Sequence, residues 1–196
     1  MKTTAIFTTR TTLNKCSKGL TFESNGDGTC SVSGIGTCTD TDIKIPSVYN
    51  GEKVTSIGDY AFSGCTGLTS VTIPDGVKSI GLAAFSECSS LKSVTIPDNV
   101  TEIGDLVFAG CTGLQNIAIG NGVTRISCGM FFICRSLVSI TIPDSVTEIG
   151  DFAFDDCRSL VNITIPDSVT SISDSAFRRC SSLKNITMGN GMSLAF

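Results

Sequence analysis

Apolar residues recur along the chain at a fixed interval of 23 residues. The interval is clearest from Cys65 to Cys180, where 115 residues hold five spacings without an insertion. Three other apolar columns keep this spacing through six units. They are Phe62, Phe85, Phe108, Phe131, Phe154 and Phe177; Leu68, Leu91, Leu114, Leu137, Leu160 and Leu183; and Ile57, Ile80, Ile103, Ile126, Ile149 and Ile172. A period of about 20 to 50 residues is typical of proteins built from stacked repeats.

Within each unit the apolar spacing changes, and the change predicts local structure. Residues 71–73 alternate with a period of two and are β-branched, which favours a short strand with one buried face. Pro74 and Asp75 then predict a turn, and residues 77–80 a second short extended segment. Asp59 and its equivalents precede an Ala-Phe-x-x-Cys motif at near-helical spacing. This favours an N-capped single helical or 3-10 turn.

One unit has too few apolar residues to enclose a core alone, so neighbouring units must stack. We therefore expect a right-handed repeat solenoid with a parallel β-sheet. Its strands are expected at 43–45, 71–73, 94–96, 117–119, 140–142, 163–165 and 186–188, which makes seven coils.

The repeat resembles a known family. Written once, the unit is Leu-x-x-Val/Ile-x-Ile-Pro-Asp-x-Val-x-x-Ile-Gly-x-x-Ala-Phe-x-x-Cys-x-x, which is similar to the BspA-like (Treponema-type) leucine-rich repeat over residues 43–192. The resemblance implies a curved leucine-rich-repeat solenoid. It also implies a secreted or surface-exposed microbial protein that takes part in adhesion and binds host proteins.

The two ends of the chain differ from the repeats. Residues 1–18 have no pattern and are expected to be disordered, whereas residues 19–56 predict an N-terminal β cap, with a hairpin at Asn25-Gly26-Asp27-Gly28, and an atypical first coil. Residues 57–196 form the solenoid, and its last unit is incomplete. An uncapped last coil would expose a sheet end to water, so self-association through this end is expected.

Composition excludes several classes of function. The net charge of −4 comes from interspersed residues, so the basic stripe that nucleic acid requires is missing. No apolar run approaches the roughly 18 residues of a membrane-spanning helix. The chain has no histidine, which removes Ser/His and Cys/His nucleophilic sites and mixed Cys/His metal sites. We expect neither an enzyme nor a cofactor.

The N-terminal sequence leaves the compartment open. It contains a lysine but no apolar h-region, so it does not resemble a secretory signal peptide. Either the protein stays inside the cell or its export signal lies elsewhere in a longer protein.

The cysteine column is expected to be structural. Stacked in-register side chains lie about 4.8 Å apart and point in parallel, so they form neither disulfides along the column nor the converging ligand set of zinc. Core packing as small hydrophobes is therefore expected for Cys65, Cys88, Cys111, Cys134, Cys157 and Cys180. Four others lie outside the column: Cys16, Cys30, Cys38 and Cys128. Of these, Cys30 and Cys38 lie near the same hairpin, where a bridge is one alternative.

The outward positions of the strands carry a repeated set of small polar residues, which is the first candidate binding surface. Polar repetitive faces are where solenoids usually bind extended partners. The alternative is that Thr and Ser are β-compatible solvent residues without a role in binding. The set comprises Ser70, Thr72, Ser93, Thr95, Asn116, Ser139, Thr141, Asn162 and Thr164.

Aspartates at the turn after each strand form a second candidate, a row of Ca²⁺ ligands. They are Asp75, Asp98, Asp144 and Asp167, and Asn121 and Asn190 interrupt the row. Their role in the turns explains these residues without an ion, so a metal is not expected.

The unit around Cys134 departs from the repeat and provides the third candidate. Phe132 and Ile133 stand at positions expected to face solvent on the convex side, and Leu106 and Phe152 lie in the neighbouring coils. These four residues could form an exposed apolar contact patch. Alternatively Met130, larger than the usual alanine, shifts the turn and lets Phe132 point inward.

Two functions remain at this stage. The first is a non-enzymatic module that binds a protein ligand, such as a host or matrix protein. The second is a structural spacer within a larger surface protein whose functional domains lie outside this chain. The resemblance implies an extracellular or cell-surface location for both.

Overall fold

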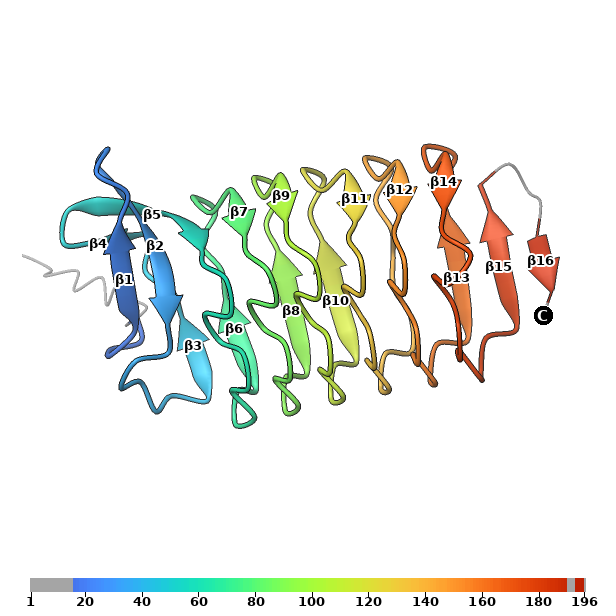
Figure 1. Cartoon of the computed structure of the whole chain (residues 1–196), viewed down its shortest axis with the longest axis horizontal. Helices are drawn as coiled ribbons and strands as arrows, with labels where there is room; N and C mark the ends of the chain where they lie inside the picture. Colours follow the sequence, from blue (N-terminus) through green and yellow to red (C-terminus); the bar gives the residue numbers. More distant parts are fainter. Residues whose placement is uncertain (1–15, 190–192, 196) are drawn as a thin grey trace, which may run out of the picture.

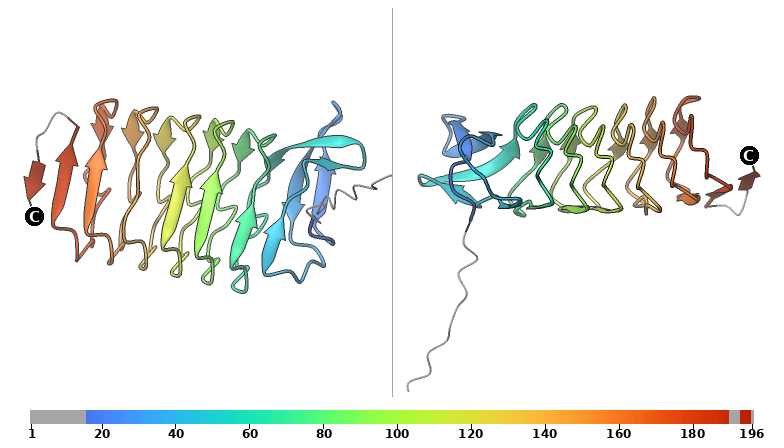
Figure 2. Two further views of the ribbon diagram at one scale, coloured as in Figure 1. Left: turned by 180° about the vertical axis from the view of Figure 1, so that it is seen from behind. Right: turned by 90° about the horizontal axis from the view of Figure 1, so that it is seen from below.

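The protein is a β-solenoid of about seven coils stacked along one axis (Figures 1 and 2). The computed structural model describes residues 16–189 and 193–195. The disorder expected for residues 1–18 therefore falls mainly outside the described residues. Within that segment, the backbone N–H of Ser17 donates a hydrogen bond to the carbonyl of Lys44 at 3.0 Å, in the first coil.

One side of the solenoid, which we name the long-strand face, carries the predicted parallel strands. Each strand pairs with its neighbour in register, so that Ile117 lies beside Val94 and Ile186 beside Ile163. The strands are β3 (Asp42–Lys44), β6 (Ser70–Thr72), β8 (Ser93–Ile96), β10 (Asn116–Ile119), β13 (Asn162–Ile165) and β15 (Asn185–Met188).

The strand expected at residues 140–142 is not formed. Only an isolated bridge between Thr141 and Thr164 joins this coil to β13, and no backbone hydrogen bond joins residues 138–142 to β10. The coil before it has Gly120 at the corner, where most coils have proline, and Gly122, where the two neighbouring coils have Asn99 and Ser145. A Cβ atom on Gly122 would lie 2.2 Å from the carbonyl oxygen of Asp98. The corner after β10 therefore lies close to the preceding coil, whereas no backbone hydrogen bond joins β10 to residues 138–142 of the following coil.

A second parallel arrangement, the short-strand face, is made by the second extended segment of each unit. Its two-residue strands follow the prediction for residues 77–80. The strands are β7 (Ser79–Ile80), β9 (Glu102–Ile103), β11 (Arg125–Ile126), β12 (Glu148–Ile149) and β14 (Ser171–Ile172). The first two extend the sheet of β5 (Glu52–Ile57), and the other three form a sheet of their own.

The N-terminal cap is a hairpin, as predicted. Strands β1 (Thr21–Ser24) and β2 (Thr29–Gly34) pair antiparallel, and β2 continues the short-strand face beside β5. The extra residues of the first coil form β4 (Val48–Tyr49), which pairs antiparallel with β5. Phe22 and Tyr49 stack at 3.9 Å and join the two hairpins.

On the third side of each coil, the predicted single helical or 3-10 turn is not confirmed. In the part of the chain that the structure describes, the Ala-Phe-x-x-Cys segments are runs of turns. Leu106 and Gly110 have φ values of 59° and 72°, and left-handed residues at two positions per unit interrupt a helix. The N–H groups of Leu106, Phe108 and Gly110 donate to the next coil at 2.7–3.0 Å, which a helix would not allow.

The aspartates expected to cap those turns join adjacent coils instead. Asp59 Oδ1 accepts a hydrogen bond from the N–H of Leu82 at 2.7 Å, and Asp105 Oδ1 accepts one from the N–H of Cys128 at 3.1 Å. Each bond spans 23 residues. These side chains therefore satisfy a backbone donor of the following coil rather than one in their own turn.

The C-terminal end reverses direction instead of adding part of another coil. Strand β16 (Ser193–Ala195) pairs antiparallel with β15, so the expected open edge of β15 is covered and the premise of an unpaired last strand is wrong. The expected position of Met192 in the next coil lies outside the described residues. Self-association through this end stays a prediction.

Candidate functional site

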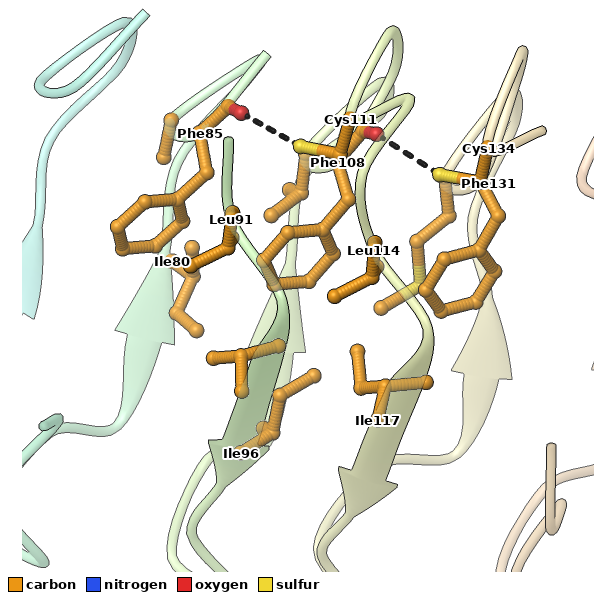
Figure 3. Close-up of a cluster of buried hydrophobic side chains, with 14 of the residues drawn as sticks. Ile80, Phe85, Leu91, Ile96, Phe108, Cys111, Leu114, Ile117, Phe131 and Cys134 are labelled. Atoms are coloured by element: carbon orange, nitrogen blue, oxygen red, sulfur yellow. Dashed lines mark hydrogen bonds between the residues drawn. The ribbon is translucent and has the colours of Figure 1, made fainter. Parts of the chain in front are cut away.

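The phenylalanine and cysteine columns form the continuous core beneath all candidate surfaces. Six phenylalanine rings stack with centroid separations of 5.1–6.0 Å, and five of them are fully buried. Figure 3 shows Phe85, Phe108 and Phe131 beside Leu91 and Leu114. Offset stacking of rings at these distances contributes about 0.5–1.5 kcal/mol per pair beyond burial.

Five of the six cysteine thiols of the column also make a specific hydrogen bond across coils. The Sγ of Cys134 donates to the carbonyl oxygen of Phe108 at 3.2 Å, and that oxygen also accepts the N–H of Cys111 at 3.1 Å (Figure 3). The same bond recurs at 3.0–3.2 Å from Cys88, Cys111, Cys157 and Cys180. The thiols therefore occupy the second lone pair of a carbonyl that would otherwise be partly unsatisfied.

The environment of this column keeps the thiols protonated. The neighbouring Cys111 thiol and burial raise the pKa of Cys88, and burial raises the pKa of Cys134 and Cys157. At half-buried Cys180, burial raises the pKa to about 11. A nucleophilic or metal-binding cysteine requires the thiolate, so the column lacks the reactive form near neutral pH.

No disulfide links Cys30 to Cys38 in the structure, and both are free. Cys30 is buried in β2, whereas Cys38 is half-buried. Burial raises the pKa of Cys65, and the nearby thiols of Cys88 and Cys38 raise it further. Cys38 therefore belongs beside the cysteine column rather than with the hairpin. The bridge between Cys30 and Cys38 is not formed in the structure.

One of the turn aspartates, Asp98, binds the backbone of the next coil. Asp98 Oδ1 accepts the N–H of Asn121 in the next coil at 2.8 Å, which is a structural role like that of Asp59. Among the described residues there is no cluster of three or more Cys, Asp or Glu side chains placed to hold a metal ion.

The long-strand face presents the small polar residues that the sequence singles out. All are exposed except Ser70, which is half-buried and donates to Asp42 Oδ1. The residues form columns along the solenoid, and where neighbouring strands pair, successive residues of a column lie about 4.8 Å apart. The two columns are Thr72, Thr95, Thr141 and Thr164, and Ser70, Ser93, Asn116, Ser139 and Asn162.

Within the described residues, free hydroxyl groups occur at all four of these threonines, but at only two of the four on the short-strand face, Thr101 and Thr124. In residues 16–189, the hydroxyls of Thr72, Thr95, Thr141 and Thr164 have no hydrogen-bond partner within the protein. On the short-strand face, by contrast, the hydroxyls of Thr147 and Thr170 each donate to a threonine carbonyl one coil earlier at 3.2 Å. The long-strand face therefore offers donors and acceptors that an external partner can use.

Sequence reasoning missed a trough along the short-strand face. Its volume is about 820 Å³, and it crosses β5, β7, β9 and β11. Ser56, Ser79, Glu102 and Arg125 line it, and Arg125 pairs with Glu148 at 3.5 Å. These four positions keep the 23-residue spacing, but their residue types differ from coil to coil, so the sequence did not indicate a groove there.

The apolar patch expected near Cys134 is only partly formed as proposed. Leu106, Phe132 and Phe152 line one hollow of about 270 Å³ together with Gly129, whereas Ile133 does not line it. Phe132 is half-buried and Met130 is fully buried, so Phe132 neither stands in solvent nor enters the core. It forms one wall of a recess between coils.

Two aspartates beside this hollow were missed, because their positions were expected to face solvent. Asp155 and Asp156 are only 1% and 2% exposed. Arg179 binds Asp155 through Nε at 2.9 Å and Nη2 at 2.8 Å, while Arg135 and Arg158 bind Asp156 at 3.0 Å and 2.7 Å. Arg158 in particular lowers the pKa of Asp156. The arginine side chains cover the carboxylates, which explains their burial.

Comparison with known proteins supports the repeat interpretation. A model described as "BspA type Leucine rich repeat region" matches residues 36–151 and 112–194, in six copies. No curated protein sequence matches the chain. A bilayer-spanning helix would need a long apolar stretch, and the described residues contain no such helix.

Solved structures show the same architecture. The chain is similar to a leucine rich cell surface protein from Faecalibacterium prausnitzii A2-165, with 36% identity and a TM-score of 0.64. The match covers 89% of this chain and 54% of that one, so the chain spans little more than half of its relative's length. It is also similar to the T. pallidum leucine rich repeat protein, with 26% identity, a TM-score of 0.59, and coverage of 91% and 72%.

Proposed function

Because the chain belongs to the BspA-type leucine-rich repeat family, we propose that it is a non-enzymatic module that binds a protein partner on its long-strand face. The observation that carries the proposal is the column of exposed threonine hydroxyls without internal partners, one in each of four coils. A partner that lies along the solenoid meets the same donor and acceptor at each of these four coils, while Ala118 interrupts the column between Thr95 and Thr141. Binding then depends on many weak polar contacts rather than on one pocket.

The proposed location is the cell surface, and the proposed partner is an extracellular protein such as a host matrix protein. Support comes from the similar F. prausnitzii protein, which is described as a cell surface protein and is 36% identical. The absence of histidine and the protonated state of the buried thiols support a role without catalysis.

Two matched sets of substitutions test the face. The first replaces Thr72, Thr95, Thr141 and Thr164 by valine; the second replaces Thr101, Thr124, Thr147 and Thr170 on the short-strand face. All eight threonines are exposed, and valine removes the hydroxyl while keeping the β-branched shape. Binding to immobilised fibronectin, fibrinogen, laminin and collagen is measured by biolayer interferometry.

The first set should weaken binding at least tenfold, because four hydrogen bonds worth about 0.5–1.5 kcal/mol each are lost. The second set should change binding less than threefold. Equal loss from both sets, or loss from the second set alone, would contradict the assignment of the long-strand face.

A second candidate function is a structural spacer. It is supported by the coverage of only 54% of the F. prausnitzii protein, which leaves room for other domains in such proteins. A spacer predicts that the unaltered chain binds none of the four matrix proteins. It also predicts that fusing the chain between two folded reporter domains changes only their separation.

A further inference from the structure

The hollow beside the turns is a second recess, on a different side of the coils from the long-strand face. Leu106, Gly129, Phe132 and Phe152 line its apolar part, and Arg178 lies at its polar rim. Leu106 and Phe152 are 37% and 38% exposed, which is unusual for large apolar side chains in a chain whose other columns are buried. Exposed apolar surface gathered in one place with a polar rim is typical of a contact site.

A glycine creates this recess. The column that contains Tyr60, Leu106 and Phe152 has Gly129 between the last two, with φ of 58°. A Cβ atom at this position would lie 2.5 Å from Cδ2 of Leu106, so any side chain would displace Leu106 and close the space. Cys128 adds to the apolar wall, because burial and the charges of Asp105 and Asp151 raise its pKa and keep the thiol neutral.

Arg178 places a positive charge at one side of the rim, whereas the charges of Asp105 and Asp151 act on Cys128 in the wall. Asp155 is buried, and Arg179 neutralises its charge through two hydrogen bonds. Arg178 is exposed, and within residues 16–189 its guanidinium makes no hydrogen bond or ion pair. The recess therefore has one guanidinium group available for an external anion.

We propose that this recess binds a peptide segment in which one large apolar side chain is followed directly by an acidic residue. The apolar side chain enters between Leu106 and Phe152 over Gly129, and the carboxylate binds Arg178. The volume of about 270 Å³ suits one side chain, since sites for whole drug-sized ligands measure about 300–1,000 Å³. An arginine fork matches a carboxylate in geometry as well as charge.

This inference does not rest on the proposed function, because it concerns other residues on another side of the solenoid. The threonine substitutions on the long-strand face leave the recess intact. Failure of either proposal therefore leaves the other standing.

The test is a titration of the ¹⁵N-labelled chain, followed by two-dimensional amide spectra. The probes are three capped peptides that share a Gly-Ser frame and differ only in a central Phe-Glu, Phe-Gln or Ala-Glu pair. The variants are Arg178→Gln, Phe152→Ser and, as a control on the short-strand face, Arg125→Gln. The spectrum of each variant also reports whether it is folded.

Phe-Glu should shift the amides of Gly129, Phe152 and Arg178, with at least fivefold tighter binding than either of the other peptides. Arg178→Gln should weaken the Phe-Glu peptide to the level of Phe-Gln and leave Phe-Gln unchanged, whereas Arg125→Gln should change neither. Phe152→Ser should weaken both phenylalanine peptides. Equal affinity for Phe-Glu and Phe-Gln would overturn the proposal. So would larger shifts at these amides with octanoate, an aliphatic carboxylate, than with Phe-Glu.

Discussion

Alkaline pH should unfold this protein through its cysteine column. Cys88, Cys134 and Cys157 are fully buried, and each donates its thiol to a phenylalanine carbonyl at 3.1–3.2 Å. Their pKa values are raised above the ordinary thiol value of about 9 by burial, together with the Cys111 thiol in the case of Cys88. The unfolded chain therefore releases these protons at a pH where the folded chain keeps them.

The sign and size of the effect follow from this difference. A raised folded pKa stabilises the fold fully below pH 9, and the contribution declines as the pH rises from 9 toward the folded value. At pH 10, one unit above the unfolded pKa, each thiol contributes about 1.4 kcal/mol less to stability than at neutral pH. Three thiols together remove about 4 kcal/mol. With a urea m-value of roughly 2 kcal/mol per M, the midpoint falls by about 2 M.

The measurement is urea unfolding between pH 7 and pH 10, followed by far-ultraviolet circular dichroism with a reductant present. The matched variant carries Cys88→Ser, Cys134→Ser and Cys157→Ser, because a hydroxyl still donates to the carbonyl but does not titrate in this range. The variant should lose about 4 kcal/mol less than the native chain between these pH values, whatever its stability at pH 7. An identical loss in both proteins would refute the role of the thiols.

Three other predictions concern stability and local opening. Replacing Phe108 by leucine removes two ring stacks and should cost about 1–3 kcal/mol in urea unfolding; Phe177→Leu, which removes one, should cost about half as much. Amides of residues 138–142 should exchange hydrogen at least tenfold faster than those of β8, because no backbone bond joins them to β10; equal protection would contradict this gap. Arg179→Gln should lower the urea midpoint by leaving Asp155 buried without its partner, and adding Asp155→Asn should recover most of the loss; no recovery would contradict a charge effect.

The repeat architecture was predictable because its signal is redundant. Six copies of one spacing place phenylalanine, leucine and isoleucine in separate columns, and only a stacked solenoid buries all of them. The hairpin at residues 25–28 was predictable for a local reason, since its Asn-Gly-Asp-Gly sequence favours a tight turn.

The turns after Asp59 and its equivalents were not predictable from local spacing. Ala-Phe-x-x-Cys fits one helical turn, but the N–H groups find better partners in the adjacent coil, and left-handed residues such as Leu106 permit this. The missing strand at residues 140–142 was not predictable either. Ile140 and Ile142 keep the apolar alternation of the other units, yet only an isolated bridge joins this coil to β13.

The candidate surfaces were predictable in part. Alternation identified the exposed threonines of the long-strand face, and the broken repeat drew attention to Phe132. The recess was not predictable from the sequence, because it combines residues of different coils. Gly129 provides its space, and Arg178, two coils further on, provides its positive charge. A periodic sequence shows where a position lies within its coil. It does not show which neighbouring side chains cover that position, and Asp155 is buried for this reason.

Threonine methyl groups allow the most direct test of binding through the long-strand face. The chain is deuterated except for labelled threonine methyls, mixed with the protonated matrix protein that it binds best, and examined by cross-saturation from the partner. Signal loss is predicted at Thr72, Thr95, Thr141 and Thr164, whose hydroxyls lack internal partners. Loss confined to the short-strand face, at Thr101, Thr124, Thr147 and Thr170, would contradict the proposal.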